Sequence, residues 1–291
     1  MLFDQVRQII VVMIQKCSMN FIEKLALIQK NNGSLLCVGL DTDFSKTPHC
    51  LKNSSDPIFE FNKEIIDTTK DLVCCYKPNI AFYEAYGVKG IEALEKTIEY
   101  IPSNIPIILD AKRGDIGNTC EMYAKSCFEH YKVDAVTISP YMGFDSIEPF
   151  SHYENKALFI LVKTSNNSAI DFQDLKIETQ QPLYLKVAEK IKEWQKKSKA
   201  TLGAVAGATY PNDLKIIREI LGELPILIPG LGSQGGDAEN TVKFGIGENK
   251  KCPILVNSSR GIIYASRDND FAERAREEAI KTKNQLNKYA N

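Results

Sequence analysis

The segment 110–115 holds two aspartates and a lysine directly after the buried apolar run 107–109. Alternate side chains of a strand share a face, so we expect Asp110 and Lys112 to point the same way. Gly114 would let the backbone turn, which places Asp115 just beyond them. Clustered charges cost desolvation and like-charge repulsion, so this pattern favours a catalytic role. A structural ion pair at the end of a strand is the alternative that this segment alone leaves open.

Eight short apolar runs recur along the chain, and each is followed by polar residues and then by a stretch of helical periodicity. Near-continuous apolar strands are typical of a parallel sheet covered by helices. Eight such units predict an α/β fold, a single-domain (β/α)8 TIM barrel over 19–291, after an N-terminal extension at 1–18. A doubly wound open sheet is the alternative, but no GxGxxG follows the first run. The runs are 35–40, 72–78, 106–110, 135–139, 158–163, 202–208, 225–228 and 253–257.

Three further segments are assigned by their pattern. A helix at 21–30 precedes the first run and is expected to cover the barrel floor. The polar segment 166–181 is interpreted as a lid or, equally, as a surface insertion. Apolar residues at helical spacing predict core-facing stripes formed by Leu183, Val187, Ile191 and Trp194 and by Phe271, Ala275 and Ala279.

Composition excludes several classes of function. The net charge of -1 gives no electrostatic reason to expect nucleic acid or an anionic membrane as a partner. The apolar stretch 9–14 is too short to span a bilayer. The eight cysteines form no CxxC pair, which indicates reduced thiols in the cytoplasm, and the three histidines show no metal-ligand spacing. We therefore expect a cytoplasmic protein without a metal site.

Polar side chains follow most of the runs, at the end where barrel enzymes carry their catalytic groups. The glycine-rich segment 229–236 and Arg260 follow the last two runs, which is typical of a phosphate site. Arg260 would add a bidentate cation and Gln234 a neutral donor. A plain turn is the alternative for the glycine-rich segment, and a turn or cap role is the alternative for Asp41. The other candidates at strand ends are Lys77, Asn79, Lys163, Thr164, Ser165, Pro229 and Ser259.

The segment 110–119 matches a longer signature, D-x-K-x-x-D-[IV]-G-x-T, through Asp110, Lys112, Asp115, Ile116, Gly117 and Thr119. Shorter matches follow in order from about residue 20 to 280: Gly39-Leu40-Asp41, Tyr76-Lys77-Pro78-Asn79, Thr164-Ser165-Asn166, Pro229-Gly230-Leu231-Gly232 and Ser259-Arg260-Gly261. With these elements the chain closely resembles the orotidine 5'-monophosphate decarboxylase family. Related sugar-phosphate decarboxylases share D-x-K-x-x-D, but they place metal ligands nearby and lack the Thr-Ser and Lys-Pro-Asn elements.

The resemblance implies that orotidine 5'-monophosphate loses its carboxylate to give UMP and carbon dioxide, the final step of de novo pyrimidine nucleotide biosynthesis, without metal or organic cofactor. Lys112 would stabilise the C6 carbanion and then protonate it. Asp110 would orient Lys112 and Lys77, and Asp115 completes the catalytic set. The implied substrate-binding residues are Asp41, Asn79, Ile116, Thr119, Thr164, Ser165, Pro229, Gln234, Ser259 and Arg260, with the Thr-Ser pair at the pyrimidine and Gln234 and Arg260 at the phosphate.

The resemblance also implies a homodimer in which Asp115, Ile116 and Thr119 reach the neighbouring active site. A complex with orotate phosphoribosyltransferase is left open, because this sequence lacks the acidic pair and Thr-Thr-Gly-like loop of that enzyme. Two rival functions stay open as well. One is a Schiff-base aldolase that uses Lys112 or Lys163. The other is a catalytically silent barrel that binds a nucleotide or serves in assembly.

Overall fold

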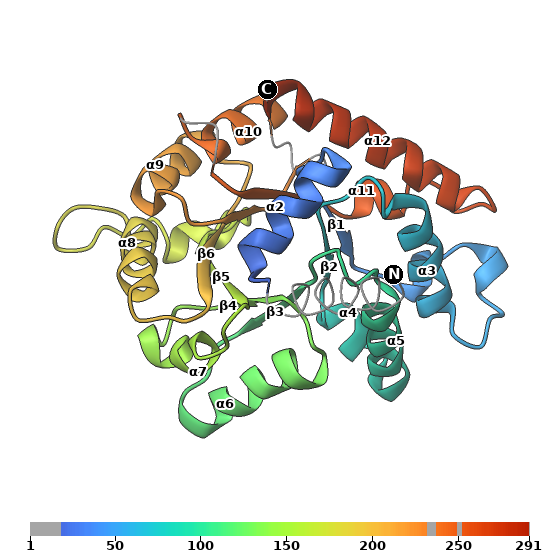
Figure 1. The fold of residues 1–291 in the computed structure, drawn as a ribbon, viewed down its shortest axis with the longest axis horizontal. Helices are drawn as coiled ribbons and strands as arrows, with labels where there is room; N and C mark the ends of the chain where they lie inside the picture. The colour runs from blue at the N-terminus through green and yellow to red at the C-terminus, as the bar shows by residue number, and fades with distance from the viewer. Residues whose placement is uncertain (1–18, 232–236, 249–251, 291) are drawn as a thin grey trace, which may run out of the picture.

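A computed structural model describes residues 19–231, 237–248 and 252–290. Its eight parallel strands form one sheet in the order β2-β1-β8-β7-β6-β5-β4-β3. Bridges between Tyr76 and Ile107 and between Asn79 and Asp110 join β2 to β3, so the sheet closes into a barrel with helices around it (Figure 1). The predicted (β/α)8 barrel is confirmed, and the open-sheet alternative is wrong. The strands are β1 (Leu36–Leu40), β2 (Cys75–Pro78), β3 (Ile108–Arg113), β4 (Ala135–Ile138), β5 (Ala157–Lys163), β6 (Thr201–Ala206), β7 (Ile226–Ile228) and β8 (Ile254–Ser258).

Apart from α2, which precedes β1, the helices follow the strands along the chain and pack against the outside of the barrel. The longer ones are α2 (Phe21–Asn32), α3 (Pro57–Thr69), α5 (Gly87–Tyr100), α6 (Gly117–Lys125), α8 (Leu183–Gln195), α9 (Pro211–Leu221), α10 (Ala238–Ile246) and α12 (Phe271–Ala290). Single turns of α-helix are α4 (Ala81–Glu84), α7 (Glu148–Ser151) and α11 (Arg260–Ile263). Short 3-10 segments are Phe44–Lys46, His49–Leu51, Gly143–Ser146 and Asn167–Asp171, and a π-helical turn covers Ser126–His130.

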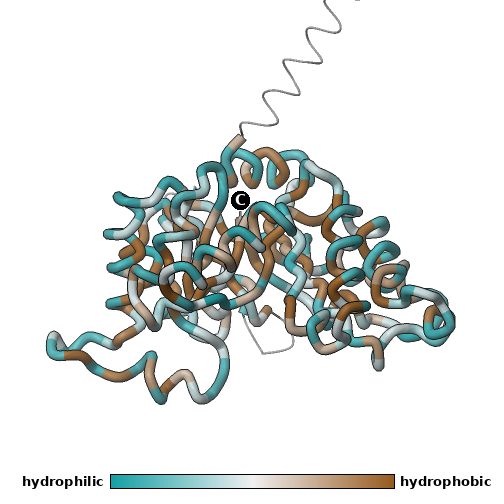
Figure 2. The backbone as a smooth tube through the Cα atoms, turned by 90° about the horizontal axis from the view of Figure 1, so that it is seen from below, coloured by the Kyte–Doolittle hydropathy of each residue, from teal (hydrophilic) through white to brown (hydrophobic). Residues whose placement is uncertain are grey.

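The core consists of the strands and the inner faces of the helices. Every residue of β1, β2, β4, β7 and β8 is buried, which agrees with their continuous apolar runs. In Figure 2, hydrophobic segments lie within the body of the molecule, while long connecting loops project from one side. The buried area is the main source of stability for such a fold.

Helix α2 covers the barrel floor, as the sequence predicts. Asn20 and Glu23 form a capping box at its start. Lys24 pairs with Asp134 at 2.8 Å, just before β4, and the Gln29 side chain donates to the carbonyl of Ile254 at 2.7 Å, at the start of β8. These contacts lie at the amino ends of strands, opposite the expected catalytic groups. The N-terminal extension at 1–18 lies outside the described residues.

Strand β3 departs from the predicted run 106–110, because it begins at Ile108 and extends to Arg113. Its register with β4 shifts between Leu109 and Arg113, and Lys112 adopts a φ of 45°. The turn that we assigned to Gly114 is therefore made at Lys112. Gly114 has another role: a Cβ there would lie 3.2 Å from the Cβ of Ser139, so glycine allows the end of β3 to approach the end of β4.

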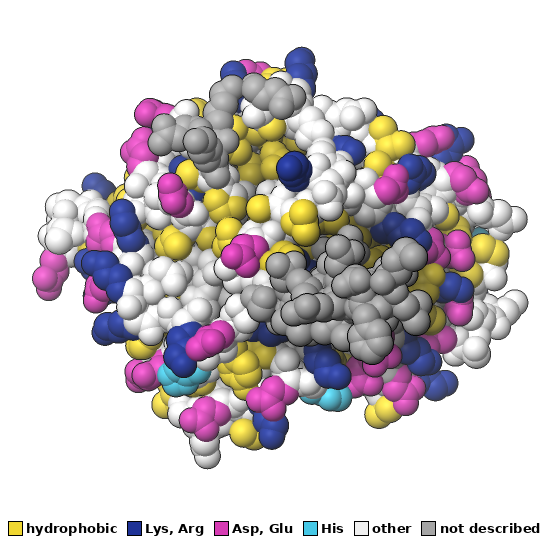
Figure 3. All heavy atoms as spheres, in the orientation of Figure 1, with side chains coloured by type: hydrophobic (Ala, Val, Ile, Leu, Met, Phe, Trp, Pro, Cys, Tyr) yellow, Lys and Arg dark blue, Asp and Glu magenta, His cyan; other side chains and the backbone are white. Residues whose placement is uncertain are grey.

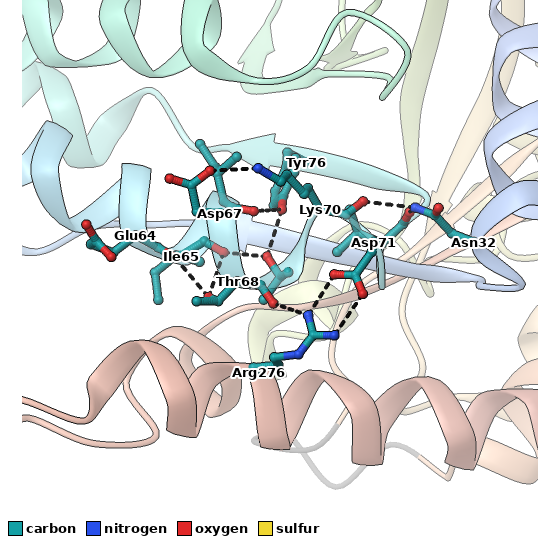
Figure 4. Close-up of polar contacts among 12 residues, drawn as sticks. Asn32, Glu64, Ile65, Asp67, Thr68, Lys70, Asp71, Tyr76 and Arg276 are labelled. Atoms are coloured by element: carbon teal, nitrogen blue, oxygen red, sulfur yellow. Dashed lines mark hydrogen bonds and ion pairs between the residues drawn. The ribbon is translucent and has the colours of Figure 1, made fainter.

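Helix α12 closes the ring of helices by packing against α3 and the turn after it. Figure 4 shows Arg276 of α12 pointing at this turn. Its guanidinium donates to the carbonyl of Thr68 at 2.7 Å and to both carboxylate oxygens of Asp71 at 2.7 and 2.8 Å. The last helix is thereby tied to the first βα unit of the barrel.

Candidate active site

Four charged side chains form an alternating row across the carboxyl ends of β1, β2 and β3. Lys77 Nζ lies 3.9 Å from Asp41 Oδ1 and 3.1 Å from Asp110 Oδ2. Lys112 Nζ lies 2.6 Å from the other oxygen of Asp110. The carboxylate of Asp110 therefore bridges two ammonium groups, and Lys77 lies between two carboxylates.

The row lies at the seam where the barrel closes. Because Asn79 and Asp110 are bridge partners between β2 and β3, the neighbouring Lys77 and Asp110 side chains meet inside the barrel mouth. The Lys77 side chain is 5% exposed and that of Asp110 12%, whereas Lys112 is 49% exposed. Lys112 is thus the member of the row that a bound molecule can reach most readily.

Burial and mutual charge determine how this row ionises. Burial alone would lower the pKa of Lys77, but the charges of Asp41 and Asp110 outweigh it and raise that pKa above its usual range. Burial alone would raise the pKa of Asp110, but Lys77 and Lys112 together hold it well below the usual value for a carboxyl. Both groups are therefore charged at neutral pH.

Thr137 is a member of the site that the sequence reasoning missed. Its hydroxyl donates to Asp110 Oδ1 at 2.9 Å and accepts the backbone N–H of Lys112 at 2.9 Å. One threonine of β4 thus fixes both the carboxylate and the backbone that carries Lys112. A polar residue within the apolar run 135–139 was the signal that could have indicated it.

The end of β8 holds Asp41 from the other side. Ser259 donates its hydroxyl to Asp41 Oδ2 at 2.6 Å, and Ser259 directly precedes α11, which begins at Arg260. A Cβ at Gly39 would collide with Ser259 Oγ, so only glycine lets β1 approach β8 this closely. Asp41, which follows the first strand, and Ser259, which follows the last, are therefore adjacent.

Several buried polar atoms at the strand ends have no hydrogen-bond partner among the described residues. They include Asp41 Oδ1 after β1, Ser165 Oγ after β5, Thr209 Oγ1 after β6 and Asn257 Oδ1 in β8. Buried polar groups without partners are costly, and native proteins seldom keep them without a use. Their common position at the barrel mouth fits a site for a polar ligand.

The end of β5 carries Thr164 and its neighbours. Gln173 accepts the Thr164 backbone N–H at 2.9 Å and donates to its hydroxyl at 2.7 Å. Lys163 forms an ion pair with Asp174, and its side chain is 3% exposed. An ammonium held in this way is a poor amine nucleophile, which argues against the aldolase alternative through Lys163.

The remaining candidates do not belong to the row. The side-chain oxygen of Asn79 accepts the N–H of Ala81 at 3.2 Å, and the carbonyl of Pro229 accepts the N–H of Ala208 at 2.9 Å. Arg260 is exposed, and Gln234 lies outside the described residues. Across the described part of the chain, no group of three or more His, Cys, Asp or Glu could hold a metal ion.

The structure does not bring Asp115 into the row of its own chain. Asp115 Oδ1 accepts the N–H of Ile116 at 2.8 Å, and within the described residues Asp115 forms no ion pair. Ile116 is 52% exposed, and Thr119 is exposed as well. The sequence predicted that Asp115 would join Asp110 and Lys112 after β3. In the structure, Lys77 and Asp41 join those two side chains instead.

The fold and the site define a (β/α)8-barrel enzyme with a lysine–carboxylate row at the carboxyl ends of its strands. Residues 34–275 match the model of the orotidine 5'-phosphate decarboxylase / HUMPS family, and the chain belongs to this family.

The similarity to known relatives extends along most of the chain. The orotidine 5'-phosphate decarboxylase of Cupriavidus taiwanensis is 47% identical over 275 residues, which cover 93% of this chain and 99% of that protein. That of Flavobacterium johnsoniae is 51% identical over 263 residues, which cover 89% and 94%. The structure of Leishmania donovani OMP decarboxylase matches with a TM-score of 0.77 at 36% identity, and the match covers 91% of this chain and 99% of that one.

Proposed function

We propose that this protein decarboxylates orotidine 5'-monophosphate to UMP and carbon dioxide. The observation that carries the proposal is the row in which Asp110 holds Lys112 at 2.6 Å and Lys77 at 3.1 Å. This row lies in a chain that is 51% identical to a named orotidine 5'-phosphate decarboxylase. The reaction needs a fixed positive charge and a proton donor at one carbon, and Lys112 can supply both.

In the proposed mechanism the bond between C6 and the carboxylate breaks, and its electron pair stays on C6. The Lys112 ammonium stabilises this carbanion electrostatically and then donates a proton to C6, so that solvent must reprotonate the amine. Asp110 and Thr137 orient Lys112 before the substrate arrives, which avoids reorganisation during the reaction. Asp41 and Asp110 together keep Lys77 charged.

The substrate would lie across the barrel mouth. Ser165 and Thr164 would contact the pyrimidine, Lys77 and Asp41 the ribose hydroxyls, and Arg260 the phosphate. The buried Ser165 Oγ and Asp41 Oδ1, which lack hydrogen-bond partners in the described chain, support this arrangement. The remaining proposed contacts are Asn79, Pro229, Gln234 and Ser259.

A homodimer would complete each site with Asp115, Ile116 and Thr119 of the neighbouring subunit. Exposed apolar side chains near this edge support the proposal: Met122 is 60% exposed, Tyr141 84% and Met142 49%. Large exposed apolar groups in one region are typical of a protein interface. A complex with orotate phosphoribosyltransferase, which the sequence left open, stays a prediction.

The proposed location is the cytoplasm, with a small nucleotide rather than a nucleic acid as the ligand. The seven cysteines that the structure describes are free, and five of them are buried. Lys, Arg, Asp and Glu side chains are interspersed on the face seen in Figure 3. No helix in the described part of the chain is long and apolar enough to cross a membrane.

The test is ultraviolet-monitored turnover of orotidine 5'-monophosphate by the purified protein in EDTA. We expect full activity in the presence of chelator and at least a 1,000-fold loss, on the order expected for an essential charged catalytic group, in Lys112→Ala. Lys63→Ala, which removes a partly exposed lysine of α3 paired with Glu60, serves as the control and should retain activity.

Two other outcomes would overturn the proposal. Activity on sugar phosphates that depends on added magnesium, without turnover of orotidine 5'-monophosphate, would favour the related metal-dependent decarboxylases. Tight binding of UMP without any turnover would favour the silent nucleotide-binding barrel.

A further inference from the structure

Tyr264 lies outside the candidate site, yet its hydroxyl contacts the backbone on both sides of Thr42. It donates to the carbonyl of Asp41 at 3.0 Å and accepts the N–H of Asp43 at 2.6 Å. We infer that Tyr264 is a positioning residue that couples the turn carrying Arg260 to Asp41 and, through Asp41, to Lys77. The inference deepens the proposed function, because it assigns this coupling to the same decarboxylation site.

The coupling is carried by a single helical turn. Tyr264 donates its backbone N–H to the carbonyl of Arg260 at 3.2 Å, and Ile263 donates to the carbonyl of Ser259 at 3.0 Å. Ser259, at the start of this turn, also donates its hydroxyl to Asp41 Oδ2 at 2.6 Å. The turn therefore holds the side chain of Asp41 through Ser259 and its backbone through Tyr264.

The ring of Tyr264 is partly buried and packs against the core. It stacks on Phe61 with ring centroids 5.8 Å apart, and Phe61 stacks on Phe271 at 5.4 Å. Burial raises the pKa of Tyr264 to about 12, so its hydroxyl remains a donor to Asp41 even at alkaline pH. A rigid ring transmits movement of the turn, because its position cannot adapt freely.

The coupling affects the longest contact of the charged row, which joins Asp41 to Lys77. Asp41 Oδ1 lies 3.9 Å from Lys77 Nζ and has no hydrogen-bond partner in the described chain, whereas Asp41 Oδ2 is occupied by Ser259. A small displacement of Asp41 therefore changes both its distance to Lys77 and the oxygen offered to a ligand. A phosphate bound at the turn of Arg260 would thus help to order the groups nearer the reacting carbon.

The test compares Tyr264→Phe with Tyr86→Phe. Both variants remove one tyrosine hydroxyl that contacts the segment after β1. Among the described residues, however, the Tyr86 hydroxyl bonds to Phe44 N, at 3.0 Å, and to the Asp43 carboxylate, at 3.2 Å, and not to Asp41. We expect Tyr264→Phe to lower kcat/KM about 10- to 100-fold, as a small misplacement of a binding group does, and Tyr86→Phe to stay within about threefold of the unmutated protein. The two variants should have similar unfolding midpoints.

A double-mutant cycle with Asp41→Asn separates positioning from general stability. If Tyr264 acts through Asp41, the loss caused by Tyr264→Phe should shrink to less than about threefold in the Asp41→Asn background. A full multiplicative loss in that background, or equal losses in Tyr264→Phe and Tyr86→Phe, would overturn the inference.

A readout that does not need activity distinguishes this inference from the proposed function. Amide hydrogen exchange of residues 41–46 should accelerate in Tyr264→Phe, because Asp43 loses the acceptor of its N–H. An unmutated protein without turnover would refute the proposed function, whereas unchanged exchange in Tyr264→Phe would refute the coupling alone.

Discussion

Asp110 is the residue on which the charged row depends, because its two oxygens serve two ammonium groups. Oδ2 contacts Lys77 at 3.1 Å, and Oδ1 contacts Lys112 at 2.6 Å and Thr137 at 2.9 Å. Removing a buried charge leaves its partners without compensation, which is more costly than replacing the whole group. The same carboxylate therefore affects both stability and the orientation of the proposed proton donor.

Asp110→Asn should lower kcat/KM by at least about 1,000-fold and destabilise the fold by roughly 3 kcal/mol, since Lys77 loses one of its two carboxylates. Asp134→Asn, which removes a paired aspartate at the opposite end of the barrel, is the control and should keep its activity. Steady-state turnover and urea unfolding of both variants measure these effects. Equal activity losses in the two variants would contradict the role of Asp110.

The pH dependence of stability gives a second prediction for Asp110. Its pKa is lower in the folded protein than the value of about 3.9 in an unfolded chain, so its contribution is present above pH of about 4 and is lost as the pH falls toward the folded pKa. The free energy of unfolding should therefore fall less steeply below pH of about 4 in Asp110→Asn than in the unmutated protein. The free energy of unfolding is measured by urea titration at each pH. If it fell equally steeply with decreasing pH in both proteins, this expectation would be contradicted.

Among the elements, the segment 164–182 is attached to the barrel through Lys163. This lysine pairs with Asp174 and lies near the rings of Tyr184 and Tyr210, 5.0 and 4.9 Å from their centroids. Lys163→Met should release the segment, with a stability loss below the roughly 3–5 kcal/mol of a fully buried pair, because Asp174 is partly exposed. Limited proteolysis within 166–181 should become faster, and KM should rise more than kcat falls. Lys176→Met, on the same segment, is the control; equal proteolysis of both variants would count against the attachment.

The helices and strands also show how much of the fold could be predicted from the sequence. The eight strands could be predicted because their apolar runs are continuous, and the stripe of Phe271, Ala275 and Ala279 on α12 is buried as expected. On α8 the predicted Ile191 and Trp194 are buried, but Leu183 and Val187 are only partly buried. Tyr184 and Ala188, one residue further along, take their places on the buried face.

Contacts between distant segments were the part of the site that periodicity could not predict. The Thr137 hydroxyl donates to Asp110, which is 27 residues away in the sequence. The Tyr264 hydroxyl donates to the carbonyl of Asp41, which is 223 residues away. The irregular backbone at Lys112 likewise depends on the local pairing of β3 with β4. Sequence spacing alone specifies neither of these.

The attachment of α12 to α3 gives a stability prediction at the same scale. Arg276→Lys loses the bidentate contact with Asp71 that Figure 4 shows, and it should destabilise the fold by about 0.5–1 kcal/mol, since the pair is partly exposed. Arg274→Lys is the matched control, because among the described residues Arg274 forms ion pairs with Asp270 and Glu277, which are close to it in sequence, and its effect should be smaller. Urea unfolding of both variants measures the difference, and a larger loss in Arg274→Lys would refute the assignment.

For the whole molecule, the position of Asp115 favours an assembly of two chains. Among the described residues the Asp115 carboxylate accepts the N–H of Ile116 and forms no ion pair, while the row already contains Lys112. A two-fold interface places the same surface of both subunits in contact, so each chain would give Asp115 to its partner and receive one in return. One active site would then need Lys112 from one chain and Asp115 from the other.

Subunit mixing tests this arrangement directly. Lys112→Ala and Asp115→Asn should each be nearly inactive as purified homodimers. When equal amounts are unfolded and refolded together, half of the dimers should contain one chain of each kind. Each of these mixed dimers has one site with both residues intact, so the mixture should regain about one quarter of the activity of the unmutated protein. Equal refolding of each variant alone controls for recovery of folded protein. If every site were built from one chain, mixing would restore nothing, because both residues would then have to come from the same polypeptide.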